Sequence, residues 1–266
     1  MNSDNNIIPN NENNVNNENN VNNVNNVNNV NNVNNENNVH NEKKIIALAF
    51  QGEYFSSKFL LCWTNTLSVL WQSGNYEFLI ASGDNSSIYH SRLRSLGLNN
   101  EIQVPFNNNK YDYWITIDKN ILFTPQQLIE LISSLEEHPV VSGLYKTEDA
   151  VNYFAVEKID LDYFANNGSF KFISQQDIDK WKTEQNTKYI PVEFTGLSFI
   201  GLRSEVLKNM DYPYFNGDNI IINNESKNLN IVPTEDYNFC KNIINKNYKI
   251  MLNIDLRVGN AVNLII

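Results

Sequence analysis

Short apolar runs alternate with longer segments of helical periodicity in the part of the chain that follows residue 42. The apolar runs are rich in aliphatic, aromatic and β-branched side chains, which is typical of buried strands in a parallel sheet. Between them, apolar residues recur three and four positions apart and predict amphipathic helices. Strands that alternate with helices predict an α/β fold, with a mixed, mostly parallel sheet flanked by helices. The predicted strands of this half lie at residues 43–50, 76–81, 113–117 and 139–145.

Three predicted helices carry sequence signals at their ends. Ser56 or Ser57 is placed to cap a helix that Gly74 closes, because serine accepts backbone hydrogen bonds and glycine adopts left-handed backbone angles. Thr124 precedes a proline, which is a favoured combination at a helix start. Thr234 precedes two acids, whose charges complement the helix dipole. We therefore expect helices to begin at these positions.

The second half of the chain has a less regular pattern. We expect an edge strand at 153–158, a helix near 177–183 among loops, a glycine turn with a strand at 192–202, and a last strand at 248–254. Residues 43–266 are long enough for a substantial core and are predicted to form a single domain, or one domain with a small appended lobe.

Residues 1–42 have a different composition from the rest of the chain. They consist almost entirely of Asn, Val and Glu, with valine at every third position from Val21 to Val33. They contain no aromatic residue, and their apolar surface is too small to offset the entropy of ordering the chain. We therefore predict a disordered low-complexity tail. This segment has no Lys or Arg and carries half of the formal net charge of −10.

The composition also argues against several classes of function. The remaining acid excess disfavours nucleic acid as a partner, because binding phosphates requires a basic face. No apolar run is long enough to span a bilayer and the N-terminus is polar, so we expect a cytoplasmic protein without a membrane span. Heavy use of Asn, Ile, Lys and Tyr suggests an AT-rich genome, such as that of a protist or a large DNA virus; for a virus, the location would be the host cytoplasm or the virion. Cys62 and Cys240 are expected to be reduced core thiols.

The strand at 113–117 ends in residues that can carry chemistry. Asp118 and Asn120 follow it directly, at the sheet edge where ligands bind in open α/β folds. Two side-chain oxygens one residue apart are suited to hold a divalent ion against a diphosphate. A polar turn after an ordinary strand would also explain both residues, and the segment alone leaves the two interpretations open.

Four short motifs extend this observation along the chain. They are DKNILFTP at 118–125, VSGLY at 141–145, FTGLSFI at 194–200 and EDYNFC at 235–240. In this order they resemble the nucleotide-sugar-dependent glycosyltransferases with the GT-A fold, including small ones encoded by large DNA viruses and bacteria. The resemblance covers roughly 44–260, nearly all of the predicted domain. It implies a GT-A fold with a nucleotide-binding half at 43–150 and an acceptor half at 151–266.

The resemblance implies transfer of a sugar from a nucleoside-diphosphate sugar to a hydroxyl of a glycan or protein acceptor. An acceptor hydroxyl needs a carboxylate to take its proton, and by resemblance Asp236 is this base, with Glu235 beside it at the acceptor site. The expected metal ligands are Asp118, Asn120 and Asn260. The residues expected around the donor are Phe50, Gln51, Gly52, Asp84, Arg92, Asp118, Lys119 and Gly196.

The departures from the family pattern change these expectations. Asn120 replaces an aspartate, and Asn260 stands where a late histidine often completes the metal site. An amide oxygen is a poorer ligand for a hard cation than a carboxylate, so we expect Mn²⁺ or Mg²⁺ to bind weakly or not at all. Lys119 is an alternative source of positive charge for the diphosphate.

Other interpretations remain open. A catalytically inactive GT-A-like domain that binds a nucleotide sugar or a glycan is the main alternative, supported by the altered Asp-x-Asp motif. Glu235 and Asp236 would also be explained by stabilisation of a helix N-terminus alone. The tryptophans Trp63, Trp71, Trp114 and Trp181 are expected in the core rather than at a sugar-binding surface. An unrelated nucleotide-binding module is disfavoured, because neither glycine-rich phosphate-binding motif follows any strand.

Overall fold

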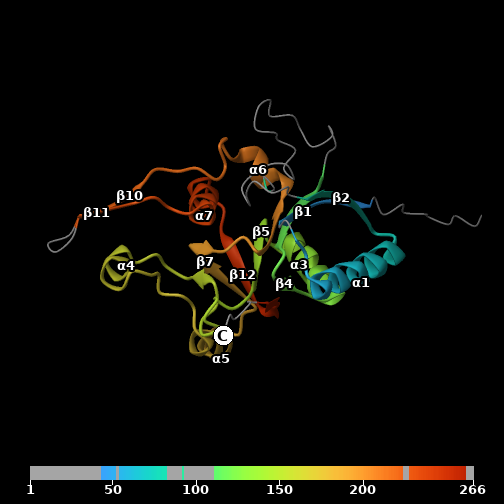
Figure 1. Ribbon diagram of the computed structural model, residues 1–266, viewed down its shortest axis with the longest axis horizontal. Helices are drawn as coiled ribbons and strands as arrows, with labels where there is room; N and C mark the ends of the chain where they lie inside the picture. The colour runs from blue at the N-terminus through green and yellow to red at the C-terminus, as the bar shows by residue number, and fades with distance from the viewer. Residues whose placement is uncertain (1–42, 52–53, 83–91, 93–110, 224–227, 262–266) are drawn as a thin grey trace, which may run out of the picture. The chain divides into compact units, whose positions relative to one another are not determined.

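The computed structural model describes residues 43–51, 54–82, 92, 111–223 and 228–261, and its centre is a seven-stranded sheet (Figure 1). Strands β2, β1, β3, β5 and β12 run in one direction, while β9 and β7 run against them. The predicted mixed, mostly parallel sheet is therefore confirmed. In spatial order the strands are β2 (Tyr76–Ser82), β1 (Lys44–Gln51), β3 (Tyr113–Asp118), β9 (Phe199–Arg203), β5 (Val140–Leu144), β12 (Ile250–Arg257) and β7 (Tyr189–Val192).

Helices flank both faces of this sheet. One apolar core joins the sheet to α1 (Ser57–Ser73) and α3 (Pro125–Glu137), and it includes Leu48 and Ile115. The core on the opposite face includes the neighbouring strand residues Ala47 and Trp114, because successive side chains of a strand point to opposite faces. The helices that contribute to this second core are α5 (Gln175–Gln185), α6 (Ser204–Asn209) and α7 (Glu235–Asn245), with α4 (Leu161–Asn167) nearby.

The predicted helix starts are confirmed by their hydrogen bonds. Ser56 caps α1, and Gly74 closes it with a φ of 69°. Thr124 forms a reciprocal capping box with Gln127 at the start of α3. The hydroxyl of Thr234 accepts a hydrogen bond from the backbone N–H of Tyr237 at 3.3 Å, which fixes the start of α7.

Among the residues that the structure describes, three pairs of short strands lie outside the main sheet. The predicted edge strand is reduced to β6 (Ala155–Val156), which pairs with β8 (Phe194–Thr195). Strand β4 (Ile121–Leu122) pairs with β13 (Gly259–Asn260) directly after the end of β3. The hairpin of β10 (Ile220–Asn223) and β11 (Asn228–Ile231) and the helix α4 were not predicted, whereas α5 covers the helix expected near 177–183.

The tryptophans divide between core and surface. Trp114 and Trp181 are buried as expected, and Trp63 is partly buried. Trp71 is 62% exposed, so its placement in the core was wrong. The reason is that α1 buries only a narrow stripe formed by Phe59, Thr66 and Leu70.

Two further expectations concern the whole chain. No helix in the described part of the chain is long and apolar enough to cross a membrane. The tail predicted to be disordered, residues 1–42, lies outside the described residues.

Candidate functional site

The end of β3 and the start of α7 come together at one end of the sheet. Asp118 is the last residue of β3 and is in register with Gln51 at the end of β1. Glu235 and Asp236 form the first turn of α7, whose position is fixed by the Thr234 cap. The carboxyl ends of parallel strands and the N-terminus of a helix are both places where α/β proteins bind polar ligands.

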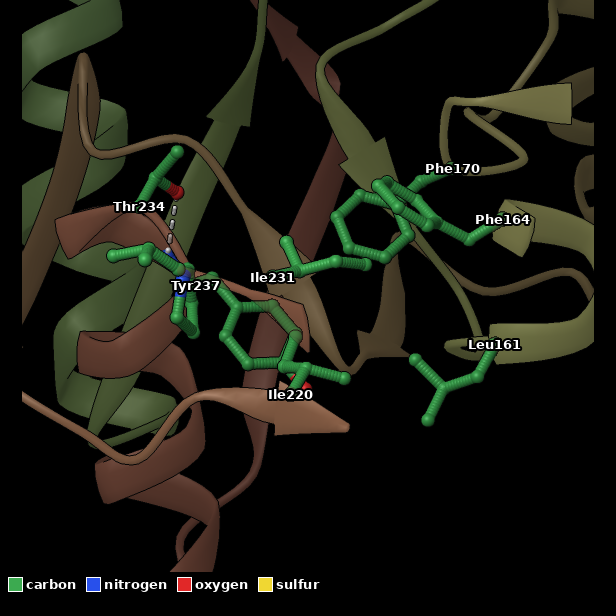
Figure 2. A pocket seen from close by; sticks show the side chains of 9 residues that line it. Leu161, Phe164, Phe170, Ile220, Ile231, Thr234 and Tyr237 are labelled. Carbon is green, nitrogen blue, oxygen red and sulfur yellow. Dashed lines mark hydrogen bonds between the residues drawn. The ribbon is translucent and has the colours of Figure 1, made fainter. Parts of the chain in front are cut away.

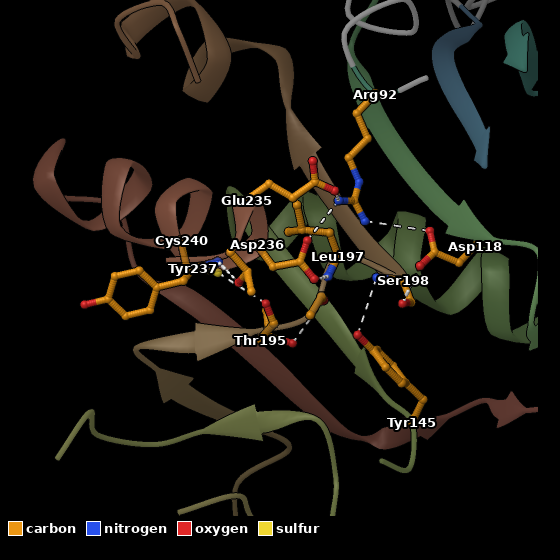
Figure 3. A network of polar contacts seen from close by, with 12 residues as sticks. Arg92, Asp118, Tyr145, Thr195, Leu197, Ser198, Glu235, Asp236, Tyr237 and Cys240 are labelled. Atoms are coloured by element: carbon orange, nitrogen blue, oxygen red, sulfur yellow. Dashed lines mark hydrogen bonds and ion pairs between the residues drawn. The ribbon is translucent and has the colours of Figure 1, made fainter. Parts of the chain in front are cut away.

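Arg92 joins these acids (Figure 3). Its guanidinium Nη1 lies 2.5 Å from Glu235 Oε1 and 2.8 Å from Asp236 Oδ1, while Nη2 lies 3.7 Å from Asp118 Oδ1. The arginine is 1% exposed, so its charge is removed from water and balanced by these carboxylates. The structure therefore places Asp118, Glu235 and Asp236 around one buried cation, although Asp118 is more than 100 positions from the other two acids in the chain.

The segment that precedes β9 contacts both sides of this network. The backbone N–H of Leu197 donates to Asp236 Oδ2 at 3.3 Å, and the hydroxyl of Ser198 donates to Asp118 Oδ2 at 2.6 Å. The backbone N–H of Ser198 also donates to the hydroxyl of Tyr145 at 3.4 Å. Ser198 and Tyr145 were not among the predicted site residues. Both belong to the motifs at 141–145 and 194–200, so position within a motif was the available signal.

Gly196 holds this segment close to its neighbours. A Cβ atom at this position would lie 1.9 Å from the Tyr145 hydroxyl and 2.4 Å from a ring carbon of Phe154. Only glycine leaves room for both side chains. Contact of Gly196 with a donor stays a prediction.

The pKa values of Asp118 and Glu235 reflect burial opposed by Arg92. Burial raises the pKa of Asp118, and Arg92 and the Ser198 hydroxyl partly offset this. Burial also raises the pKa of Glu235; Arg92 lowers it, while Asp236 and Asp118 add to the rise. Burial alone would lower the pKa of Arg92, but the three carboxylates outweigh it and the pKa is raised, so the guanidinium stays charged. A carboxylate with a raised pKa is a stronger proton acceptor.

The segments that contain Asn120 and Asn260 lie side by side. Asn260 pairs with Ile121 in the β4–β13 ladder, and the backbone N–H of Ala261 donates to the Asn120 carbonyl at 2.8 Å. The side-chain amide of Asn260 donates to the Lys146 carbonyl at 2.9 Å, and Asn120 is exposed.

These groups do not fit a tightly held divalent ion. The carboxylates of Asp118, Glu235 and Asp236 already surround the Arg92 guanidinium, which occupies the position between them. The two asparagines offer only neutral amide oxygens. Within the described residues, no group of three or more His, Cys, Asp or Glu is arranged to hold a metal ion.

The other predicted donor residues are placed as follows. The ring of Phe50 is buried in the core against Phe59 and Trp63, with ring centroids 5.7 and 4.3 Å away, so its side chain faces away from a ligand at the strand end. Lys119 is exposed directly after Asp118. Gly52 and Asp84 lie outside the described residues.

The comparisons with known proteins give limited information. No family model matches the chain, and no curated protein matches it. Among solved structures, A197 from STIV is 14% identical with a TM-score of 0.45, covering 79% of this chain and 82% of that one. GalNAc-T7, solved with UDP, GalNAc and Mn²⁺, is 13% identical with a TM-score of 0.42. That match covers 83% of this chain and 38% of the GalNAc-T7 chain. At these TM-scores and identities, neither similarity bears on the function of this chain.

Proposed function

We propose that this protein is a glycosyltransferase that moves a sugar from a nucleoside-diphosphate sugar to a hydroxyl of a glycan or protein acceptor. The observation that supports this proposal is the meeting of Asp118, Glu235 and Asp236 around Arg92 at the carboxyl end of the sheet. These acids come from the first and last of the four motifs that resemble GT-A glycosyltransferases.

In this proposal Asp236 accepts the proton of the acceptor hydroxyl. A bond forms between the acceptor oxygen and the anomeric carbon, while the bond between that carbon and the diphosphate oxygen breaks. Asp236 is oriented for this step by the Leu197 N–H on one oxygen and by Arg92 on the other. General base catalysis by a positioned carboxylate contributes about 10²–10⁴ in rate.

The negative charge of the departing diphosphate requires a positive partner. The exposed side chain of Lys119, next to Asp118, supplies this charge in our proposal. Mn²⁺ or Mg²⁺ bound at Asp118 and Asn120 would act as a Lewis acid on the same diphosphate, but the amide ligands and Arg92 make this a weak site at most.

The second candidate is a catalytically inactive domain that binds a nucleotide sugar or a glycan. The observation that favours it is that the buried Arg92 guanidinium forms ion pairs with both Glu235 and Asp236, so both carboxylates already have a partner within the protein.

The test combines thermal stability with turnover in the full chain. The protein is incubated with UDP- and GDP-sugars, with CMP-sugars as a monophosphate comparison, each with and without Mn²⁺. A donor present at 100-fold above its Kd stabilises the fold by about 2.7 kcal/mol. We expect a raised Tm with one diphosphate donor, together with release of the nucleoside diphosphate and transfer to a sugar acceptor.

Asp236→Asn is the informative variant and Asp211→Asn is its control. Asp211 pairs with Lys246 at the surface, where its side chain is 87% exposed. We expect Asp236→Asn to lower transfer at least about 100-fold while keeping the Tm shift with donor, and Asp211→Asn to change neither. A Tm shift without turnover in the wild type would support the inactive binding domain. The absence of a shift with every donor would refute the transferase and also an inactive domain that binds a nucleotide sugar.

A further inference from the structure

An apolar pocket lies beside the first turn of α7 (Figure 2). Its walls come from α4, from the two strands β10 and β11, and from the residues that lead into α7. Its cavity volume is about 90 Å³, which is smaller than the site of a whole drug-sized ligand and suits a single small group. The lining residues are Leu161, Phe164, Phe170, Ile220, Ile231, Val232, Pro233, Thr234 and Tyr237.

The walls of this pocket are suited to an apolar ring or chain. The rings of Phe170 and Tyr237 are parallel within 5°, with centroids 6.0 Å apart. The ring of Phe164 packs against that of Phe170, with centroids 4.9 Å apart. Thr234 is the polar residue at the entrance to α7, and its hydroxyl already accepts the capping hydrogen bond of the helix. A ligand made only of hydroxyl groups would lose hydrogen bonds to water here without replacing them.

One side of the pocket is open to solvent. Val232, which lines this side, is 78% exposed. Exposed apolar side chains that adjoin an apolar pocket are typical of a ligand-binding surface. A ligand can therefore enter without displacing the core.

The pocket and the acid network share a single helical turn. Thr234 and Tyr237 line the pocket, while Glu235 and Asp236, which lie between them in the chain, contact Arg92. Residues three apart lie on one face of a helix, and the residues between them point elsewhere. A molecule held in the pocket is thus within one helical turn of the proposed base.

We propose that this pocket binds an apolar group, an aryl ring or a short alkyl chain, that is attached to the acceptor sugar. The identity of the occupant as an acceptor rests on the proposed function. The apolar walls favour such a group over a nucleobase, whose polar edges need several hydrogen-bond partners. The lining side chains that carry hydroxyl groups are Thr234, which already caps α7, and Tyr237. The pocket size matches a single ring or short chain rather than a protein segment.

The test compares phenyl β-glucoside with methyl β-glucoside, which differ only in the group that would enter the pocket. Binding to the full chain is measured by ligand-observed NMR and isothermal titration, without donor. Burial removes the apolar ring from water, so we expect the phenyl glucoside to bind at least about tenfold more tightly.

Two variants and a control connect this preference to the pocket. Leu161→Asn and Val232→Asn each place an amide in the wall, and Val232 is exposed enough for the fold to tolerate the change. Tyr163→Asn is the control, because this residue belongs to α4 but does not line the pocket. We expect both pocket variants to lose most of the preference for phenyl glucoside, and the control to keep it. The Tm shift caused by a nucleotide sugar should be the same in all three.

The outcomes separate this proposal from the proposed function. A phenyl preference that the pocket variants lose, in a protein that transfers no sugar, would support the binding site and refute the transferase. Equal binding of the two glucosides, or a preference that both pocket variants keep, would overturn the proposed site even if the protein transfers sugar.

Discussion

Replacing Arg92 by methionine tests whether the candidate site depends on one buried charge. The arginine side chain is 2% exposed, whereas those of Asp118, Asp236 and Glu235 are 19–25% exposed. Removal of one partner from a buried ion pair costs about 3–5 kcal/mol, because it leaves buried charge without a partner. Solvent reaches part of each carboxylate and screens their repulsion, so we expect Arg92→Met to lower the free energy of unfolding by about 3 kcal/mol at neutral pH.

The destabilisation caused by Arg92→Met should depend on pH in a defined direction. Burial raises the pKa of Asp118 and Glu235 above the values of the unfolded chain, so between the two values the native state binds more protons. The free energy of unfolding contributed by these groups therefore falls as pH rises through that window. Loss of Arg92 removes the positive charge that lowers both pKa values. The pH range in which the native state binds more protons than the unfolded chain therefore extends to higher pH. The destabilisation should thus be largest at neutral pH and shrink on acidification, by up to about 1.4 kcal/mol per pH unit for each proton bound.

Urea unfolding followed by tryptophan fluorescence measures this effect at pH 5 and pH 7.5. The control is Lys180→Met, which removes an exposed pair with Glu184 whose charged atoms are 4.0 Å apart. This surface pair should contribute less than about 1 kcal/mol with little pH dependence. The double variant Arg92→Met with Glu235→Gln should recover part of the loss, because it removes one of the repelling carboxylates. A cost for Arg92→Met equal to that of the control, or as large at pH 5 as at pH 7.5, would refute this reasoning.

Two further predictions concern packing and metal binding. Gly196→Ala adds a Cβ 1.9 Å from the Tyr145 hydroxyl and should lower the free energy of unfolding, measured in urea, by about 1–3 kcal/mol. Gly259→Ala is the control and should lower it less, because the nearest atom to its Cβ would lie 3.4 Å away. Equal losses in the two variants would contradict the close contact at Gly196. Asn120→Asp supplies a carboxylate beside Asp118, so Mn²⁺ should raise the Tm of this variant more than that of wild type or of Asn167→Asp, an exposed control. An unchanged Mn²⁺ response would remove Asn120 from the candidate metal position.

The predictable parts of the fold are those with local causes. The caps at Ser56, Thr124 and Thr234 act within one helical turn, so short sequence patterns predicted them. The strand that ends at Asp118 was predicted from its run of aromatic and β-branched residues. Helix α4 was missed because it has only seven residues, too few for a periodic pattern.

The arrangement around Arg92 has causes that are distant in the chain. Its two ion pairs with α7 join residues 143 and 144 positions apart, and no local pattern encodes such a contact. Resemblance to a family suggested that Asp118, Glu235 and Asp236 belong to one site, but it gave no reason to expect that an arginine lies between them. Ser198 was missed because a serine beside a glycine turn has no distinctive chemistry until its partner Asp118 is known.

Strand β9 has a consequence for how the protein can be divided. It comes from the second half of the sequence, yet its backbone hydrogen-bonds to β3 on one side and to β5 on the other. A fragment that stopped at residue 150 would leave both of these strands with open edges in the middle of the sheet, where unpaired backbone favours aggregation. Residues 43–150 and 151–266 are therefore interleaved parts of one folding unit, and neither should be expressed without the other.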